Sequence, residues 1–388
     1  MKKILIMHPA LVVGGAEKVL LDMLQVLDKE KYSITLLLIC PAIWDDKIPS
    51  NISVHYMFSQ DPRKKGSFLS RLYKYLMIAC PGLIYKYWGV KDKFDIAIAY
   101  HEPMIWYLPC TNAYTVSWIH TDYAALDWFP EVKQLRNKNG YLANWINRKR
   151  IKLINSFDRV VFVAKSAIPG YIQKTGFDIK KTAVCYNINN EKQILLKATE
   201  PIMDECWNSY VGDHLVVVGR IHCQKAMYRL IPLMLHIKEA HLTAKIFIIG
   251  DGPERKKLER LIKDNHLEKD ILILGFSNNP FKYVRHAKLL ICTSYFEAYC
   301  TATKESIILE TPFVTTLCSG MEEQINGTYA GLIASNEDDT LAPLVIDVLT
   351  NENLYAKMKM DIHKRHLELS DENAILNIHS FLDSCVNK

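Results

Sequence analysis

The sequence has no run of about eighteen consecutive apolar residues, so we expect no segment that spans a membrane. No Gly-x-Gly-x-x-Gly motif follows an expected strand, which argues against a nicotinamide-dependent dehydrogenase. The basic clusters lie in no recognisable nucleic-acid-binding module, so we expect no nucleic-acid partner. The composition of the whole sequence, 49% hydrophobic and 23% charged residues, excludes a disordered chain.

The ten cysteines are scattered, and none forms a Cys-x-x-Cys pair or a Cys/His metal-binding pattern. We therefore expect neither a zinc site nor a redox motif, and we interpret the cysteines as free thiols in a reducing, cytoplasmic compartment. The apolar stretch near the amino terminus is interrupted by His8 and Pro9. Residues 3–7 are therefore interpreted as a buried first strand and not as a secretion signal.

Continuous apolar runs alternate with helical segments along the chain, which is typical of βαβ units with parallel sheets. Strands of the first half are expected at residues 3–7, 33–39, 53–58, 95–100, 115–119, 159–164 and 182–186. Strands of the second half are expected at residues 214–218, 245–249, 271–274, 288–293, 313–316 and 330–334. Helices are expected between them, notably at 16–27, 68–87, 141–156, 165–175, 227–240, 254–265 and 301–309.

A chain of 388 residues is too long for one ordinary core and suits two domains. We predict an α/β fold of two doubly wound, Rossmann-like domains that face a central cleft. The first is expected to span residues 1–195 and the second residues 196–369, with residues 370–388 packing back on the first. Ligands of such sheets bind beyond the carboxyl ends of the strands, so the cleft is the expected active site.

Charged side chains follow the expected strands of the second half. Arg220 and Lys225 are two cations five positions apart, and such a pair suits a diphosphate. Glu297 ends a strand and Glu305 lies in the next helix, whose first amides would attract phosphate while the carboxylates accept hydrogen bonds from sugar hydroxyls. Taken singly, each of these charges could equally be solvated, and the turn at Gly250-Asp251-Gly252-Pro253 could be an ordinary strand-to-helix connection.

Taken together and in this order, these motifs resemble glycosyltransferase family 4. The resemblance rests on Arg220 to Lys225, Gly250-Asp251-Gly252-Pro253, Gly275-Phe276-Ser277-Asn278-Asn279-Pro280, Glu297 and Glu305 in a Glu-x7-Glu pattern, and Gly14-Gly15-Ala16-Glu17. It covers residues 213–335 closely and the first half at scattered points. It implies a GT-B fold and retaining transfer of a hexosyl residue from a nucleotide-diphosphate sugar, such as a UDP-sugar. We expect neither a metal nor a cofactor, because the Asp-x-Asp motif of metal-dependent glycosyltransferases is missing.

The resemblance also implies roles for single positions. Arg220 and Lys225 would hold the donor diphosphate as it leaves, Glu297 would bind hydroxyls of the transferred sugar, and Glu305 those of the ribose. His120 is similar to the family's cleft-facing histidine. The implied catalytic residues are His120, Arg220, Lys225 and Glu297. The implied donor-binding residues are Gly14, Gly15, Arg220, Lys225, Gly250, Gly275, Phe276, Glu297, Tyr299, Cys300, Thr301 and Glu305.

Two alternatives stay open, and two departures from the family pattern bear on donor choice and on the accessory-subunit alternative. Ala226 and Ala298 stand where the family often has glycine, and each adds a methyl group near the donor. One alternative is a nucleotide-sugar epimerase of the same architecture, which would use the donor site without an acceptor. The other is a non-catalytic, glycosyltransferase-like accessory subunit, against which the retained charged residues argue.

The two halves differ in charge. Residues 1–190 carry 26 Lys and Arg against 15 Asp and Glu, a net of +11, and residues 191–388 carry 22 against 27, a net of −5. A basic half predicts an anionic partner, such as a lipid-linked saccharide acceptor or the inner face of the plasma membrane. The segment 68–87 mixes apolar and basic residues, which fits an interfacial amphipathic helix or a core-packed helix with a basic outer face.

Overall fold

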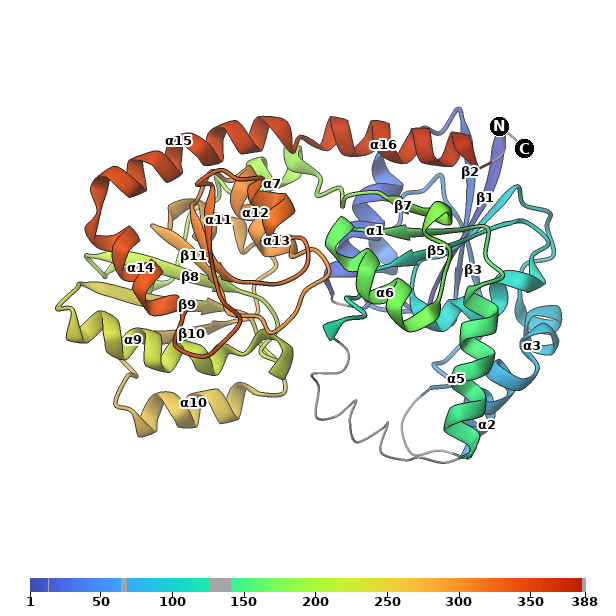
Figure 1. Ribbon diagram of the computed structural model, residues 1–388, viewed down its shortest axis with the longest axis horizontal. Coiled ribbons are helices and arrows are strands. Elements are labelled where there is room, and N and C mark those ends of the chain that lie inside the picture. Colours follow the sequence, from blue (N-terminus) through green and yellow to red (C-terminus); the bar gives the residue numbers. More distant parts are fainter. Residues whose placement is uncertain (13, 64–67, 126–140, 386–388) are drawn as a thin grey trace. The chain divides into compact units, whose positions relative to one another are not determined.

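The computed structural model describes residues 1–12, 14–63, 68–125 and 141–385 (Figure 1). The chain divides into two compact units. Unit 1 comprises Met1–Ile188 with Glu372–Lys388, and unit 2 comprises Asn189–Asp371. The division therefore falls after Ile188, whereas the sequence analysis put it after residue 195. The last helix of the chain, α16 (Asp371–Ser384), belongs almost entirely to unit 1.

Unit 1 is built on a seven-stranded parallel sheet with the order β3-β2-β1-β4-β5-β6-β7. The central strands β1 and β4 are largely apolar and buried, because helices cover both faces of the sheet (Figure 1). All seven strands lie where the sequence predicts them, with ends that shift by a few residues. They are β1 (Lys2–His8), β2 (Tyr32–Leu38), β3 (Ser53–Tyr56), β4 (Ile96–Ala99), β5 (Tyr114–Ile119), β6 (Arg159–Phe162) and β7 (Thr182–Val184).

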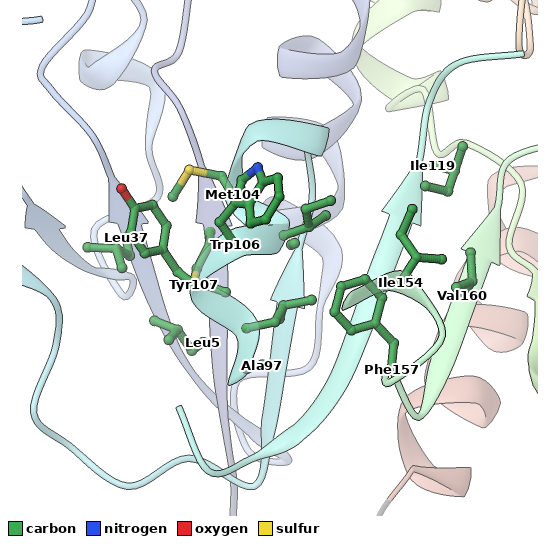
Figure 2. Packing of buried hydrophobic residues seen from close by; sticks show 14 of the residues in the cluster. Leu5, Leu37, Ala97, Met104, Trp106, Tyr107, Ile119, Ile154, Phe157 and Val160 are labelled. Atoms are coloured by element: carbon green, nitrogen blue, oxygen red, sulfur yellow. The ribbon is translucent and has the colours of Figure 1, made fainter. Parts of the chain in front are cut away.

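The helices of unit 1 include one segment that the sequence analysis missed. The 3-10 helix η2 (Glu102–Cys110) buries Met104, Trp106 and Tyr107 against strand residues of the sheet (Figure 2). The α-helices are α1 (Gly15–Val26), α2 (Phe68–Ala79), α3 (Pro81–Trp88), α5 (Tyr141–Ile154) and α6 (Ile168–Thr175). Helix α16 joins this unit through an ion pair in which Lys2 Nζ lies 3.1 Å from an Asp383 carboxylate oxygen.

The single helix predicted over residues 68–87 is wrong, because the structure has two helices there. Helix α2 ends at Ala79, and α3 begins at Pro81, whose ring removes a backbone donor and suits a first helical position. The pair buries Tyr73, Ile84 and Tyr85 in the core. It also leaves five large apolar side chains exposed, namely Leu72, Tyr75, Leu83, Tyr87 and Trp88. Part of the segment thus packs in the core and part is exposed, and its placement at a membrane interface stays a prediction.

Unit 2 is built on a six-stranded parallel sheet with the order β10-β9-β8-β11-β12-β13. Its strands are β8 (Asp213–Val218), β9 (Ala244–Ile249), β10 (Ile271–Gly275), β11 (Leu289–Cys292), β12 (Phe313–Thr316) and β13 (Gly331–Ala334). Its α-helices are α7 (Glu191–Lys197), α8 (Glu205–Asn208), α9 (Leu230–Glu239), α10 (Arg255–Asp264), α11 (Phe281–His286), α12 (Thr301–Ile308), α13 (Met321–Ile325), α14 (Leu341–Thr350) and α15 (Glu352–Glu368). Helices α7 and α8 occupy a stretch that the sequence analysis expected to be irregular.

Each sheet has one point at which the strand order reverses, between β1 and β4 in unit 1 and between β8 and β11 in unit 2. Neighbouring connections leave such a point in opposite directions, which opens a crevice at the carboxyl ends of the two strands. Among the described residues, no helix is both long and apolar enough to cross a bilayer.

Candidate active site

Two neighbouring loops at the carboxyl edge of the unit 2 sheet are held together by backbone hydrogen bonds. The Ile221 amide donates to the Asp251 carbonyl over 3.0 Å, and the Glu254 amide donates to the Ile221 carbonyl over 3.1 Å. Gly250 and Gly252 permit this contact, because a Cβ atom at Gly250 would lie 1.8 Å from the Gly219 carbonyl oxygen and one at Gly252 would lie 2.3 Å from that of Ile221. Gly250 therefore packs against the loop that carries Arg220, and a direct contact with the donor stays a prediction.

Arg220 itself lies exposed at the end of β8. No other described residue forms a hydrogen bond or an ion pair with its guanidinium. Its backbone is fixed from both sides, since the Gly219 amide donates to the Ile249 carbonyl over 3.1 Å and Ile221 is held as above. The structure thus presents an unpaired cation on a fixed backbone at the reversal point of the sheet.

The turn that carries Lys225 is bonded to the segment after β11. The Thr293 hydroxyl donates to the Lys225 carbonyl over 2.5 Å, and the Gln224 side-chain amide donates to the Phe296 carbonyl over 2.9 Å. The turn closes through Ala226, which is buried and has a left-handed backbone with φ 44° and ψ 40°. This conformation is strained for alanine and easy for glycine, which explains why glycine suits this position.

Lys225 and Glu297 form an ion pair across this contact. Lys225 Nζ lies 2.6 Å from Glu297 Oε1, and the Ser294 hydroxyl donates to the same oxygen over 2.6 Å. Burial is the largest single influence on the Lys225 ammonium and lowers its pKa. The charge of Glu297, the neighbouring Cys300 and Cys292 and the hydrogen bond to Glu297 together exceed that effect and raise the pKa above its usual value. Lysine 225 is therefore a permanent cation. Glu297 Oε2 has no hydrogen-bond partner among the described residues, so it can accept a hydrogen bond from a ligand.

Helix α12 begins directly after this ion pair. Its amino-terminal cap is Cys300, and the Gln324 side-chain amide donates to the Cys300 carbonyl over 3.1 Å, which fixes the start of the helix. Tyr299 and Cys300 are buried and Thr301 is half-buried. The first amides of a helix have no partner within the helix and favour an anion, so the start of α12 adds positive potential beside Lys225.

The other predicted donor-binding residues of unit 2 lie at the same edge of the sheet. Glu305 is buried within α12, and Gly275 ends β10 with a left-handed φ of 83°. Phe276 follows it with 55% of its surface exposed, which is uncommon for a phenylalanine and leaves its ring open to a ligand. Sequence reasoning missed Ser294 as a site residue. Its position just after β11, at the edge of the sheet where ligands bind, could have indicated it.

Unit 1 carries a second group of polar residues, at the reversal point of its own sheet. His8 ends β1, His101 follows β4, and His120 follows β5. The rings of His8 and His101 lie 5.5 Å apart, and those of Tyr100 and His120 lie 4.4 Å apart. Of these residues only His120 was predicted. His8 and His101 could have been recognised from their positions, because each ends or follows a strand at the edge of the sheet where ligands bind.

His8 is buried, and His101 and His120 are half-buried. Four of their nitrogen atoms have no hydrogen-bond partner among the described residues: both of His8, Nδ1 of His101 and Nε2 of His120. Burial lowers the pKa of all three imidazoles, and that of His120 falls to about 3. They are therefore neutral at physiological pH. Because an unpaired buried polar atom is costly, the arrangement suits a ligand that brings hydroxyl groups.

Gly14 and Gly15 lie at the start of α1 in the same unit. Gly14 is the amino-terminal cap and has an extended backbone, and a Cβ atom there would lie 2.3 Å from Glu17 Oε2. Burial raises the pKa of the Glu17 carboxyl. A side chain at Gly14 would therefore have to displace Glu17, so the loop keeps its main chain uncovered, as the prediction of close approach to phosphates requires.

The fold is that of GT-B glycosyltransferases. HepE from Anabaena, solved in complex with UDP-glucose, superposes with a TM-score of 0.75 at 15% identity, covering 99% of this chain and all of HepE. TarM from Staphylococcus aureus, solved with UDP, superposes with a TM-score of 0.71 at 15% identity over the whole of both chains. Identities this low establish the fold and not the reaction.

The family model of glycosyl transferases group 1 matches residues 212–365, which form most of unit 2. Curated relatives include the N-acetylgalactosamine-N,N'-diacetylbacillosaminyl-diphospho-undecaprenol 4-alpha-N-acetylgalactosaminyltransferase of Campylobacter jejuni, which is 27% identical over 54% of this chain and 55% of its own length. An uncharacterised glycosyltransferase of Methanocaldococcus jannaschii is 27% identical over 36% of this chain and 34% of its own. The chain thus spans a third to about half of these relatives. The chain therefore has the GT-B fold, and its unit 2 is similar to glycosyl transferases group 1.

Proposed function

We propose that this protein transfers a hexosyl-type residue from a UDP-sugar to a saccharide or lipid-linked saccharide, with retention of configuration and without a metal. The observation that carries the proposal is the meeting of Lys225, Glu297 and the start of α12 at the reversal point of the unit 2 sheet, next to Gly219, which directly precedes Arg220. This is an anion site with a sugar-binding carboxylate next to it, which is what a nucleotide-diphosphate sugar requires.

The reaction follows from these charges. The bond between the sugar carbon and the diphosphate oxygen breaks, and its electrons leave with the nucleoside diphosphate. The Lys225 ammonium, the Arg220 guanidinium and the first amides of α12 oppose that growing negative charge. Glu297 Oε2 holds hydroxyls of the transferred sugar, Glu305 those of the ribose, and Phe276 contacts the base. The acceptor oxygen then bonds to the sugar carbon and its proton is released.

Unit 1 supplies the acceptor side in this proposal. His120, with His8 and His101, offers neutral nitrogen atoms to hydroxyl groups, and Gly14 and Gly15 leave main chain open to phosphate. A lipid-linked acceptor is supported by the Campylobacter relative, whose name specifies a diphospho-undecaprenol-linked substrate. A UDP donor is supported by the complexes of the structural neighbours with UDP and UDP-glucose.

We also propose peripheral contact with an anionic membrane, at the cytoplasmic face, through α2 and α3. Their exposed apolar side chains lie among exposed cations at Arg71, Lys74 and Lys86, which suits insertion beside acidic headgroups. The neighbouring basic residues Lys64 and Lys65 lie outside the described residues. Replacing Leu72, Tyr75, Leu83 and Tyr87 by serine should abolish co-sedimentation with phosphatidylglycerol vesicles. Unchanged sedimentation would refute the contact.

The transfer proposal is tested with a panel of UDP- and GDP-sugars, measuring thermal stabilisation and release of the nucleoside diphosphate. We expect stabilisation by UDP and at least one UDP-sugar, and release that accelerates when a saccharide or undecaprenyl-diphosphate-linked saccharide is added. Conversion of the donor to an isomer without an acceptor would instead identify an epimerase. Binding without turnover under any of these conditions would identify an accessory subunit.

A further inference from the structure

Three buried thiols surround the ion pair of the proposed donor site. Cys292 Sγ and Cys300 Sγ are 3.9 Å apart, although eight positions separate them in the sequence. Cys318 Sγ donates to the Ser294 carbonyl over 3.2 Å. Cys292 ends β11 and Cys300 caps α12, so the connection between these two cysteines holds Ser294 and Glu297. The sequence analysis expected no redox motif from the spacing of the cysteines, and the proximity of this pair comes from the fold.

Two kinds of chemistry suit such a group. Cys292, Cys300 and Glu297 bring one ligand atom each within 4.8 Å of one another, which fits a thiophilic metal ion. The Lys225 ammonium, however, lies 2.6 Å from a Glu297 oxygen and would repel a cation at that place. The same ammonium favours a thiolate. The hydrogen bond from Cys300, together with Lys225, lowers the pKa of the Cys292 thiol despite its burial. Charge therefore favours redox chemistry over metal binding.

We propose that Cys292 and Cys300 form a reversible disulfide that switches off the donor site. With a hydroperoxide as oxidant, the Cys292 thiolate attacks one peroxide oxygen, and sulfenic acid and water or alcohol result after proton transfer. The Cys300 thiol then displaces the hydroxyl group of the sulfenic acid, giving the disulfide and water. Two thiols and one peroxide are consumed, so two electrons pass from sulfur to oxygen. Closure requires the sulfur atoms to approach from 3.9 Å to about 2.05 Å.

The consequence for donor binding rests on the proposed function. The new bond would pull the cap of α12 toward the end of β11 and shift the loop between them. That loop positions Glu297 against Lys225 through Ser294 Oγ and Glu297 Oε1, which are 2.6 Å apart. A displaced helix start and a displaced carboxylate both weaken the hold on the diphosphate sugar. The oxidised protein should therefore lose the stabilisation by UDP that the reduced protein has.

One tryptic peptide reports the disulfide directly. Residues 289–304 lie between Lys288 and Lys304 without another cleavage site, so a single peptide contains both cysteines. The full chain is first reduced and freed of metal by a chelator, and then treated with hydrogen peroxide. It is alkylated without reduction and digested with trypsin, and the masses of the peptides are measured by mass spectrometry. We expect this peptide to be two hydrogen atoms lighter and unalkylated, and to gain two alkyl groups when dithiothreitol precedes alkylation. A bond to Cys318 would instead link this peptide to a second one, and that outcome overturns the proposed pairing.

Matched variants separate the switch from general oxidation. C292S should keep its own UDP-dependent shift in unfolding temperature after peroxide, whereas C318S and the exposed-site variants C80S and C206S should lose it as the wild type does. The proposal is refuted if the peptide stays a dithiol while Cys80 and Cys206 oxidise, or if C292S loses its shift like the wild type. Failure of the donor site itself would appear differently, as no UDP shift in the reduced wild type.

Discussion

Replacing Lys225 with methionine tests whether the ion pair serves stability, catalysis or both. The change keeps most of the side-chain volume and removes the ammonium 2.6 Å from Glu297. Among the residues that the structure describes, the buried carboxylate then keeps only the hydrogen bond from Ser294. Removing one partner of a fully buried pair costs about 3–5 kcal/mol. Because 24% of the Lys225 side chain is exposed, water can reach the carboxylate, so we expect a smaller loss of about 2 kcal/mol in the free energy of unfolding.

The rate should fall further than this loss of stability explains. A cation that opposes charge on the leaving group contributes about 2.7–4 kcal/mol to the barrier, so transfer or donor cleavage should slow about 100- to 1,000-fold at saturating donor. The double variant K225M/E297Q removes the unpaired charge while keeping an oxygen that accepts from Ser294. It should recover most of the stability and none of the rate. Urea unfolding and nucleoside-diphosphate release measure the two effects on the same samples.

An exposed ion pair in the same unit provides the control. Lys238 Nζ lies 2.7 Å from an Asp270 carboxylate oxygen, and their side chains are 49% and 22% exposed. K238M should change the free energy of unfolding by less than about 1 kcal/mol and leave the rate unaltered. The reasoning fails if K225M retains the wild-type rate, or if the double variant recovers activity together with stability.

Three further changes probe the rest of the account. R220A should leave the unfolding midpoint unchanged, because the side chain is exposed and unpaired among the described residues. It should reduce donor turnover by about 100-fold or more. R260A, which removes an exposed arginine of α10, is the matched control, and equal rates for the two variants would disprove the role of Arg220. G250A forces a Cβ atom to 1.8 Å from the Gly219 carbonyl oxygen, so it should lower the free energy of unfolding, measured with urea, by about 1–3 kcal/mol or more. G82A is the control, because a Cβ atom at this position of α3 meets open space, and it should be neutral or stabilising. Burial lowers the pKa of His120 in the folded protein to about 3, while the unfolded side chain titrates near 6.5. The free energy of unfolding is therefore unaffected by His120 above pH 6.5 and decreases as the pH falls below 6.5. H120Q should lessen this decrease by up to about 1.4 kcal/mol per pH unit, and parallel wild-type and H120Q curves between pH 7.5 and 4.5 would contradict the burial argument.

The strands were predictable because parallel strands covered on both faces are continuous apolar runs. The runs at β1 and β9 were recognisable without knowing their neighbours. The boundary between α2 and α3 was missed, because the sequence analysis did not use Pro81 as the start of a new helix. The 3-10 helix η2 was missed because its apolar residues lack a helical period and are ordered by packing on the sheet.

For the site, spacing indicated which charges follow strands, and the contacts between them depended on tertiary structure. That Lys225 pairs with Glu297, 72 positions away, follows from β8 lying beside β11, which no local pattern reveals. The same adjacency rule could have suggested His8 and His101. The proximity of Cys292 and Cys300 required the geometry of the β11–α12 connection. Sequence thus identified the edge of the sheet, and structure identified the partners.

The central claim is that Lys225, Arg220 and the start of α12 hold the diphosphate of a nucleotide sugar. A crystal structure of the protein with UDP or a non-hydrolysable UDP-sugar tests it most directly. The account predicts phosphate oxygens within hydrogen-bond distance of Lys225 Nζ and the Arg220 guanidinium, with a sugar hydroxyl on Glu297 Oε2. A diphosphate bound away from both cations, with the ion pair of Lys225 and Glu297 intact and untouched, would contradict it.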